Sequence, residues 1–376
     1  MGTRGNALLT SALGRYSLRH YKRDAAQPTP VYVLDSGEVD ASTRLPYLDH
    51  GILDILANAT NGIAVVLEHR YYGASTPQRS HLGPGDRWGV DELRWLTTEQ
   101  ALEDNAQFVQ RMTFDGVPSE QMARIRAPHT PVIFYGGSYP GAKSAFSRVL
   151  YPHLVWGSLA SSAVVAAIEQ FPDYFYPIAA GAQQDCTQAI QASIAWMDEI
   201  IAPNPRSGSH QPDRNENMTR QLMSLFALNE LTSVTDFANV LSSPLGSFQA
   251  LNWDPSVTSD EFETFCTALV GQASGPVSPA PQRRAQGEAL DAPDVVLKYA
   301  HYIKDNVVSS CTRANMTVDE CFGSQDWSSF TNATELSDEN GISWSFQVCT
   351  QVSAPFSRTS YLCSRTAVRM YSGATL

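Results

Sequence analysis

The first 165 residues alternate between short apolar runs and amphipathic stretches. The runs 31–34 and 62–70 are rich in β-branched residues and predict buried strands, and 132–135 and 154–160 predict two more. Thr97 and Gln100 have the spacing of a capping box, so we expect a helix to begin there. Strands and helices that alternate over short links predict an α/β fold with a doubly wound parallel sheet.

After residue 171 the pattern becomes mostly helical. Residues 185–270 contain helical stretches separated by polar loops, and the proline-rich segment 271–294 predicts a loop. We therefore expect a helical cap that is inserted into the sheet domain. The predicted parts are the N-terminal part of the core at 1–170, the cap at 171–340, and an incomplete return to the core at 341–376.

A serine lies where the apolar run 132–135 gives way to a helical pattern. Gly136 and Gly137 precede Ser138, and Pro140 follows two residues later. In α/β-hydrolases a nucleophilic serine occupies such a strand-to-helix turn, with small residues two positions away on either side. Pro140 departs from this pattern, but it suits a helix that starts there because the first turn leaves its N–H groups unpaired. The motif alone leaves two interpretations, a nucleophile or an ordinary hydroxyl at a glycine-rich strand end.

Charge and hydropathy narrow the range of partners. The chain has 376 residues with 26 basic and 38 acidic side chains, which gives a net charge of −12. We therefore expect no nucleic-acid partner, and no apolar run approaches the roughly 18 residues of a membrane span, so we expect no membrane partner either. The N-terminal apolar stretch is too short for a signal-peptide core. A transit peptide is the alternative interpretation of the basic N-terminus, but the alternation at 15–21 favours a strand.

Six cysteines are scattered without the C-x-x-C spacing of zinc sites or redox dithiols, and no glycine-rich phosphate loop is present. We therefore expect no metal and no cofactor, and two or three disulfides. Four Asn-x-Ser/Thr sequons favour the secretory pathway and are candidate glycosylation sites. They are Asn58, Asn217, Asn315 and Asn332.

Several motifs occur in a fixed order around Ser138. Glu-His-Arg-Tyr-Tyr-Gly stands at 68–73, Gly-Gly-Ser-Tyr at 136–139, Tyr-Pro-His-Leu-Val at 151–155 and Trp-Ser-Phe-Gln-Val-Cys-Thr at 344–350. Together they resemble the serine peptidase family that includes lysosomal Pro-Xaa carboxypeptidase, dipeptidyl peptidase II and fungal proline-specific peptidases. The resemblance covers roughly residues 15 to 365.

The resemblance implies an α/β-hydrolase core with a helical cap, which cleaves peptide substrates beside proline at a chain end through an acyl-enzyme. It places the nucleophile at Ser138 and one oxyanion donor at the backbone N–H of Tyr139, with the turn around Gly37 as the expected second donor. It also implies a disulfide between Cys186 and Cys349 and a secreted, vacuolar or lysosomal location.

The same resemblance places the triad aspartate and histidine beyond the cap, on the last strands of the sheet. No histidine follows His301 in this sequence, and His153, His210 and His301 each have a structural or solvated explanation. We therefore expect the triad aspartate, the triad histidine and the last strands to be absent from this chain, which would leave weak activity at best. The alternatives are a non-catalytic hydrolase homologue and an esterase- or lipase-type hydrolase. The oligomeric state stays open, as does the choice among carboxypeptidase, dipeptidyl or tripeptidyl peptidase and endopeptidase action.

Overall fold

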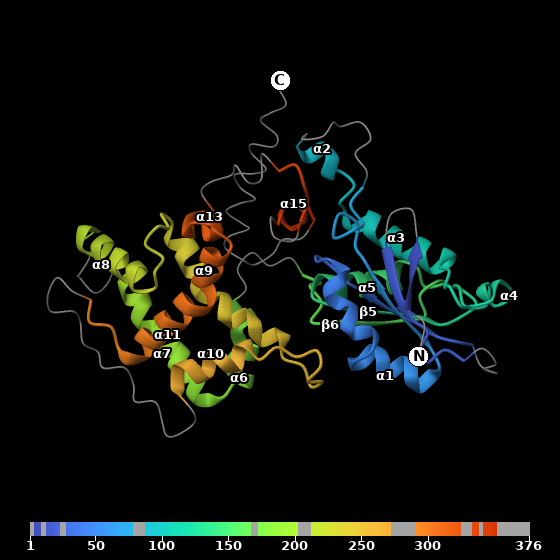
Figure 1. The fold of residues 1–376 in the computed structure, drawn as a ribbon, viewed down its shortest axis with the longest axis horizontal. Coiled ribbons are helices and arrows are strands. Elements are labelled where there is room, and N and C mark those ends of the chain that lie inside the picture. Colours follow the sequence, from blue (N-terminus) through green and yellow to red (C-terminus); the bar gives the residue numbers. More distant parts are fainter. Residues whose placement is uncertain are drawn as a thin grey trace. The chain divides into compact units, whose positions relative to one another are not determined.

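The computed structural model forms two compact units (Figure 1). We name them the sheet unit (1–169, 254–257 and 328–376) and the helical unit (170–253 and 258–327). The residues that the structure describes are 4–8, 13–22, 28–77, 87–166, 172–201, 212–271, 290–324, 333–337 and 341–351.

The described part of the sheet unit contains a six-stranded sheet with the order β1-β2-β4-β3-β5-β6. Four strands run parallel, and β2 pairs antiparallel with β1 and β4. This arrangement confirms the predicted parallel strands, although β6 begins three residues later than the apolar run at 154–160. The bounds are β1 Arg4–Leu8, β2 Leu13–Ser17, β3 Val31–Asp35, β4 Ile63–Leu67, β5 Val132–Gly137 and β6 Gly157–Ser161.

Helices cover both faces of this sheet because side chains on successive strand residues point to opposite faces. Val33 and Val65 pack with Phe108 of α3, while Leu34 and neighbouring side chains pack with Leu53 of α1. The predicted cap of α3 is confirmed, since the Thr97 side chain accepts a hydrogen bond from the Gln100 N–H. The helices are η1 Ala41–Leu48, α1 Gly51–Thr60, α2 Val90–Leu93, α3 Thr98–Arg111, α4 Ser119–Met122, α5 Tyr139–Leu150 and α15 Ile342–Thr350.

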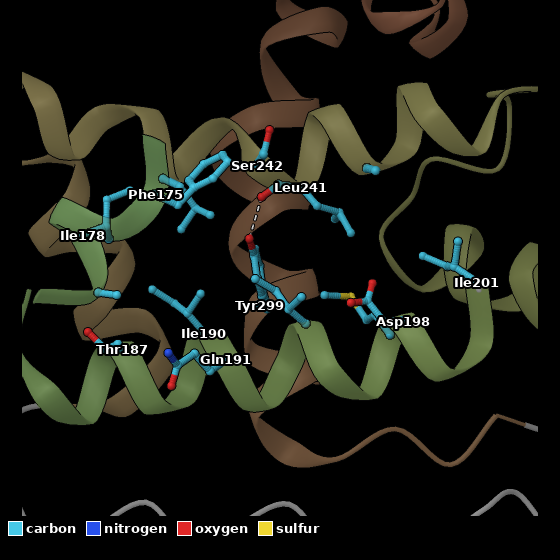
Figure 2. A pocket seen from close by; sticks show the side chains of 15 residues that line it. Phe175, Ile178, Thr187, Ile190, Gln191, Asp198, Ile201, Leu241, Ser242 and Tyr299 are labelled. Carbon is cyan, nitrogen blue, oxygen red and sulfur yellow. Dashed lines mark hydrogen bonds between the residues drawn. The ribbon is translucent and has the colours of Figure 1, made fainter. Parts of the chain in front are cut away.

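The helical unit has its own apolar core, in which the rings of Phe265 and Tyr299 meet edge to face at 4.9 Å. A cavity of about 370 Å³ opens within this unit, and Figure 2 shows Ile190 of α7 and Leu241 of α9 on its two walls. The described elements are η2 Pro172–Phe175, α6 Tyr176–Gly181, α7 Gln184–Ile201, α8 Pro212–Leu225, α9 Val234–Gly246, η4 Ser247–Ala250, α10 Glu261–Val270, α11 Asp294–Tyr302, the π-helical η5 Ile303–Val308, α12 Ser309–Arg313 and α13 Val318–Phe322.

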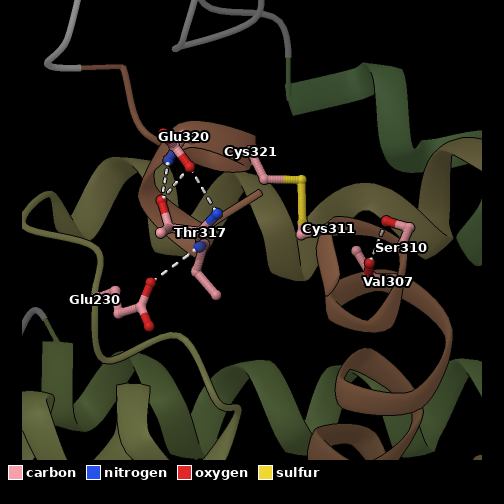
Figure 3. The surroundings of a disulfide bond; sticks show 8 residues. Glu230, Val307, Ser310, Cys311, Thr317, Glu320 and Cys321 are labelled. Atoms are coloured by element: carbon pink, nitrogen blue, oxygen red, sulfur yellow. Dashed lines mark hydrogen bonds between the residues drawn. A yellow bond between two sulfur atoms is a disulfide. The ribbon is translucent and has the colours of Figure 1, made fainter. Parts of the chain in front are cut away.

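The disulfide pairing implied by the resemblance is wrong. Cys186 bonds to Cys266, because α7 and α10 pack together in the helical unit and bring the two Cα atoms to 5.2 Å. A second disulfide joins Cys311 of α12 to Cys321 of α13 (Figure 3). Cys349 lies on α15 in the sheet unit and is also disulfide-bonded. The predicted number of two or three disulfides is consistent with these bonds.

Three of the four sequons carry exposed asparagines, at Asn58, Asn217 and Asn315. The fourth, Asn332, lies outside the described residues. Their exposure leaves room for a glycan, and glycosylation at these positions stays a prediction.

Candidate active site

Ser138 joins the end of β5 to the start of α5 in an unusual backbone conformation. Its φ of 61° and ψ of −126° lie outside the regions that non-glycine residues ordinarily occupy, as at the nucleophile of α/β-hydrolases. The Ser138 N–H donates to the Ser161 carbonyl at 3.0 Å, and the Ser138 carbonyl accepts from Ala142 at 3.1 Å. These bonds hold the turn from both sides while the serine side chain stays exposed.

Small residues are required around this turn, at the usual position before the serine but one residue beyond the usual position after it. A Cβ on Gly136 would overlap the backbone of Pro140, and one on Gly141 would lie 2.8 Å from the Ser161 carbonyl. Pro140 is the second residue of α5, so its missing N–H costs no helical hydrogen bond. Its ring lies against Gly37, where a Cβ would overlap it. Pro140 therefore fits this turn, and Gly141 and Gly37 provide the space beside it.

The two predicted oxyanion donors differ in their surroundings. Tyr139 is the first residue of α5, so its N–H belongs to the group that a helix leaves unpaired. Gly37, with a φ of 71°, donates its N–H to Asp35 Oδ1 at 3.0 Å, and the Ser36 N–H donates to the Leu67 carbonyl. Gly37 would have to release this hydrogen bond to act as a donor, and its role stays a prediction. Burial raises the pKa of the Glu38 carboxyl, the next residue in the turn.

A buried ion pair connects α5 to this turn. Lys143 Nζ lies 2.7 Å from Asp35 Oδ2, and the two side chains are only 2% and 1% exposed. Asn105 of α3 donates to the same Asp35 oxygen at 3.3 Å. Sequence reasoning missed this pair. Its signal was a lysine on the apolar face of α5 together with an aspartate that ends an apolar strand.

The Tyr139 side chain lies at a second buried polar cluster. Its hydroxyl is 3.3 Å from His69 Nε2, 3.0 Å from Gln347 Nε2 and 3.4 Å from Thr98 Oγ1. Burial, followed by the nearby charge of Lys143, holds the pKa of His69 well below its usual range, so this histidine is neutral. Burial also raises the pKa of Tyr139. Arg70, the residue after His69, forms two hydrogen bonds to Asp104 at 2.5 and 2.7 Å and so connects the loop after β4 to α3.

None of the histidines considered from sequence is hydrogen-bonded to Ser138 among the described residues. His153 is exposed just after α5, and His210 lies outside the described residues. His301 lies on α11 of the helical unit, where it is exposed and pairs with Asp305 at 3.0 Å. Both ring nitrogens of His69 have other partners, Tyr139 and the Arg70 carbonyl.

The residues that the structure describes contain no group of three or more histidine, cysteine, aspartate or glutamate side chains that could hold a metal ion. Nor do they contain a helix with the length and apolar character needed to cross a membrane.

A family model and the curated relatives that match this chain carry serine carboxypeptidase or related peptidase names. The family model described as "Serine carboxypeptidase S28" matches residues 15–372. The "Probable extracellular serine carboxypeptidase" of Arthroderma benhamiae is 34% identical over 346 residues, which cover 89% of this chain and 45% of that protein. The human "Lysosomal Pro-X carboxypeptidase" is 38% identical over 125 residues, or 33% of this chain and 22% of that protein. The chain therefore spans less than half the length of each of these two relatives.

Solved structures also match, with low scores. One is the thioesterase domain from the curacin biosynthetic pathway, with a TM-score of 0.28 and 9% identity over 54% of this chain and 60% of that chain.

Proposed function

Because this chain belongs to the serine carboxypeptidase S28 family, we propose that it carries the nucleophile of a serine-type peptidase and that this nucleophile is Ser138. The observation that carries the proposal is the backbone of Ser138, which presents an exposed hydroxyl on a strained strand-to-helix turn. Serine hydroxyls at such turns attack carbonyl carbon in α/β-hydrolases.

The proposed reaction proceeds through an acyl-enzyme. Ser138 Oγ bonds to the peptide carbonyl carbon and gives its proton to a base, and the Tyr139 N–H stabilises the negative oxygen that forms. The C–N bond then breaks, the leaving amine takes the proton, and water hydrolyses the ester. The base in this reaction is a histidine oriented by an aspartate; the resemblance places both beyond the cap, and neither lies beside Ser138 among the described residues.

We propose peptides cleaved beside proline near a chain end as the substrates. The support is the name of the human relative, a Pro-X carboxypeptidase, together with the carboxypeptidase name of the fungal relative. These relatives are named as lysosomal and extracellular, and we propose a location in the secretory pathway for this chain too. Its disulfides and exposed sequons agree with that location.

A fluorophosphonate probe tests the nucleophile directly because it reacts covalently with activated serines. We expect the folded chain to be labelled at Ser138 and the Ser138→Ala variant to remain unlabelled. Ser161→Ala, which changes an exposed serine at the end of β6, is the matched control and should label normally. A folded wild-type chain without label would overturn the proposal and favour a non-catalytic homologue.

Peptide turnover tests the substrate. Since no histidine is hydrogen-bonded to Ser138 among the described residues, we expect slow cleavage of a peptide with penultimate proline and a free carboxyl end, and at least tenfold less with alanine in place of proline. Turnover of short acyl esters with no preference for proline would overturn the peptidase assignment in favour of an esterase.

A further inference from the structure

The residue after the nucleophile is held by hydrogen bonds from three other segments of the sheet unit. Tyr139 is 3% exposed, and its hydroxyl contacts His69 from the loop after β4, Thr98 from α3 and Gln347 from α15. Gln347 is fully buried, and its other end accepts a hydrogen bond from the Tyr72 hydroxyl at 2.5 Å.

The hydrogen bonds in this cluster all donate in one direction along the series of groups. His69 Nδ1 is 2.7 Å from the Arg70 carbonyl, which only accepts, so Nδ1 carries the hydrogen. A neutral imidazole then has a lone pair on Nε2, and the Tyr139 hydroxyl must donate to it. The Tyr139 oxygen is left to accept from Gln347 Nε2.

Each bond in the series fixes the orientation of the next group. The Tyr72 hydroxyl donates to Gln347, Gln347 donates to Tyr139, Tyr139 donates to His69, and His69 donates to the Arg70 carbonyl. A flipped Gln347 amide would face the Tyr139 oxygen with its own oxygen, although the Tyr139 hydrogen is already given to His69. The cluster therefore has one satisfied arrangement, as expected for a buried polar network that specifies a unique geometry.

We propose that Gln347 is a positioning residue, which acts through this one-way hydrogen-bond chain to hold Tyr139 and thereby its backbone N–H as the oxyanion donor for Ser138. This inference rests on the proposed function of Ser138. It makes the seating of α15 on the sheet unit a condition for full reactivity of the serine.

Contacts at both ends of α15 support this role. Ser343 donates to the Tyr71 carbonyl at 3.1 Å, and the Thr98 N–H donates to Gln351 at 3.0 Å. Between them, Phe346 joins the apolar cluster of Tyr72 and neighbouring side chains. Gln347 is thus anchored on both sides along the helix, and a displacement of α15 moves the group that bonds Tyr139.

The first experiment reads the hydrogen-bond direction by nitrogen NMR of histidine-labelled chain at pH 7.5, with His69→Gln to assign the signal. We expect His69 to be the Nδ1–H tautomer with a hydrogen bond accepted at Nε2. A proton on Nε2 would overturn the inference whether or not Ser138 reacts.

The second experiment measures the rate constant of Ser138 labelling by the fluorophosphonate in three variants of the chain. Gln347→Leu fills the space without polar atoms, Gln347→Glu keeps an acceptor for Tyr72 but cannot donate when ionised, and Tyr139→Phe removes only the hydroxyl. We expect each to lower the rate constant roughly tenfold, because a misplaced oxyanion donor loses part of the 10²–10³-fold effect of one donor. Ser345→Ala on the same helix is the matched control and should stay within twofold of wild type.

The outcomes separate the two proposals. If folded wild-type chain does not label, the proposed function fails and the positioning role fails with it. If wild type labels and the three variants label equally fast while folded, only the positioning role is overturned. A lower melting temperature with an unchanged rate constant would assign Gln347 a merely structural role.

Discussion

At the scale of single residues, the two adjacent glycines before the nucleophile differ in how closely other atoms approach them. A Cβ on Gly136 would overlap the Pro140 backbone, whereas a Cβ on Gly137 has only the Ser161 carbonyl nearby, at 4.0 Å. We predict that Gly136→Ala lowers the free energy of unfolding by about 1–3 kcal/mol, the usual cost of overpacking, and abolishes labelling of Ser138. Gly137→Ala is the matched control and should not lower stability, since a compatible Gly→Ala change raises it by about 0.4–1 kcal/mol. Denaturant unfolding measures both, and equal losses would contradict this assignment.

His69 gives the fold a pH dependence of predictable sign. Burial keeps this side chain neutral in the folded state, while the unfolded chain binds a proton near the ordinary pKa of about 6.5. Its contribution to stability is therefore complete above pH 6.5 and is lost as the pH falls below it, by up to about 1.4 kcal/mol per pH unit. We predict a smaller loss between pH 7.5 and 5.5 in His69→Gln than in wild type, as measured by denaturant unfolding.

The exposed His153 provides the control for this measurement. His153→Gln should keep the pH dependence of wild type. If His69→Gln loses as much stability on acidification as wild type does, the buried histidine is not the source of the effect.

At the scale of elements, the Lys143–Asp35 pair joins α5 to the end of β3. Removing one partner leaves an uncompensated buried charge, which typically costs about 3–5 kcal/mol. We predict such losses for Lys143→Met and for Asp35→Asn, and a loss in the double variant that is smaller than their sum by at least about 2 kcal/mol. A double-mutant cycle in denaturant measures this coupling. Additive losses would show that the two charges do not stabilise one another.

The sequence predicted most elements because their apolar periods are local properties. The strands around Val33, Val65 and Phe134, the cap at Thr97 and the turn at Ser138 each follow from a few adjacent residues. The polar contacts beneath the turn did not follow in this way. Tyr139 and Gln347 are 208 positions apart, and no local pattern indicates that they meet.

The same limit explains the wrong disulfide. Cys186 and Cys266 are 80 positions apart, and only the packing of α7 on α10 selects this pair among the possible ones. The order of cysteines along the chain, which the resemblance compares, does not indicate which of them lie in the same unit of the fold.

At the scale of the whole molecule, each unit buries its own core. The sheet unit packs apolar side chains on both faces of the sheet, and the helical unit packs aromatic rings around Phe265 and Tyr299. Both disulfides with described partners lie in the helical unit. These two crosslinks should therefore act on the stability of that unit.

The two disulfides should contribute unequally because they close loops of different length. Cys186–Cys266 spans 80 positions and Cys311–Cys321 spans 10. In the chain-entropy model these loops correspond to about 4.5 and about 2.7 kcal/mol at 25 °C. We predict that replacing Cys186 and Cys266 by alanine speeds amide hydrogen exchange in α7 and α10 more than replacing the other pair does. The double replacement of Cys311 and Cys321 is the matched control, since it also removes one crosslink from this unit. Equal effects, or a larger effect of the short loop, would mean that native packing around each bond outweighs the entropy of the unfolded chain.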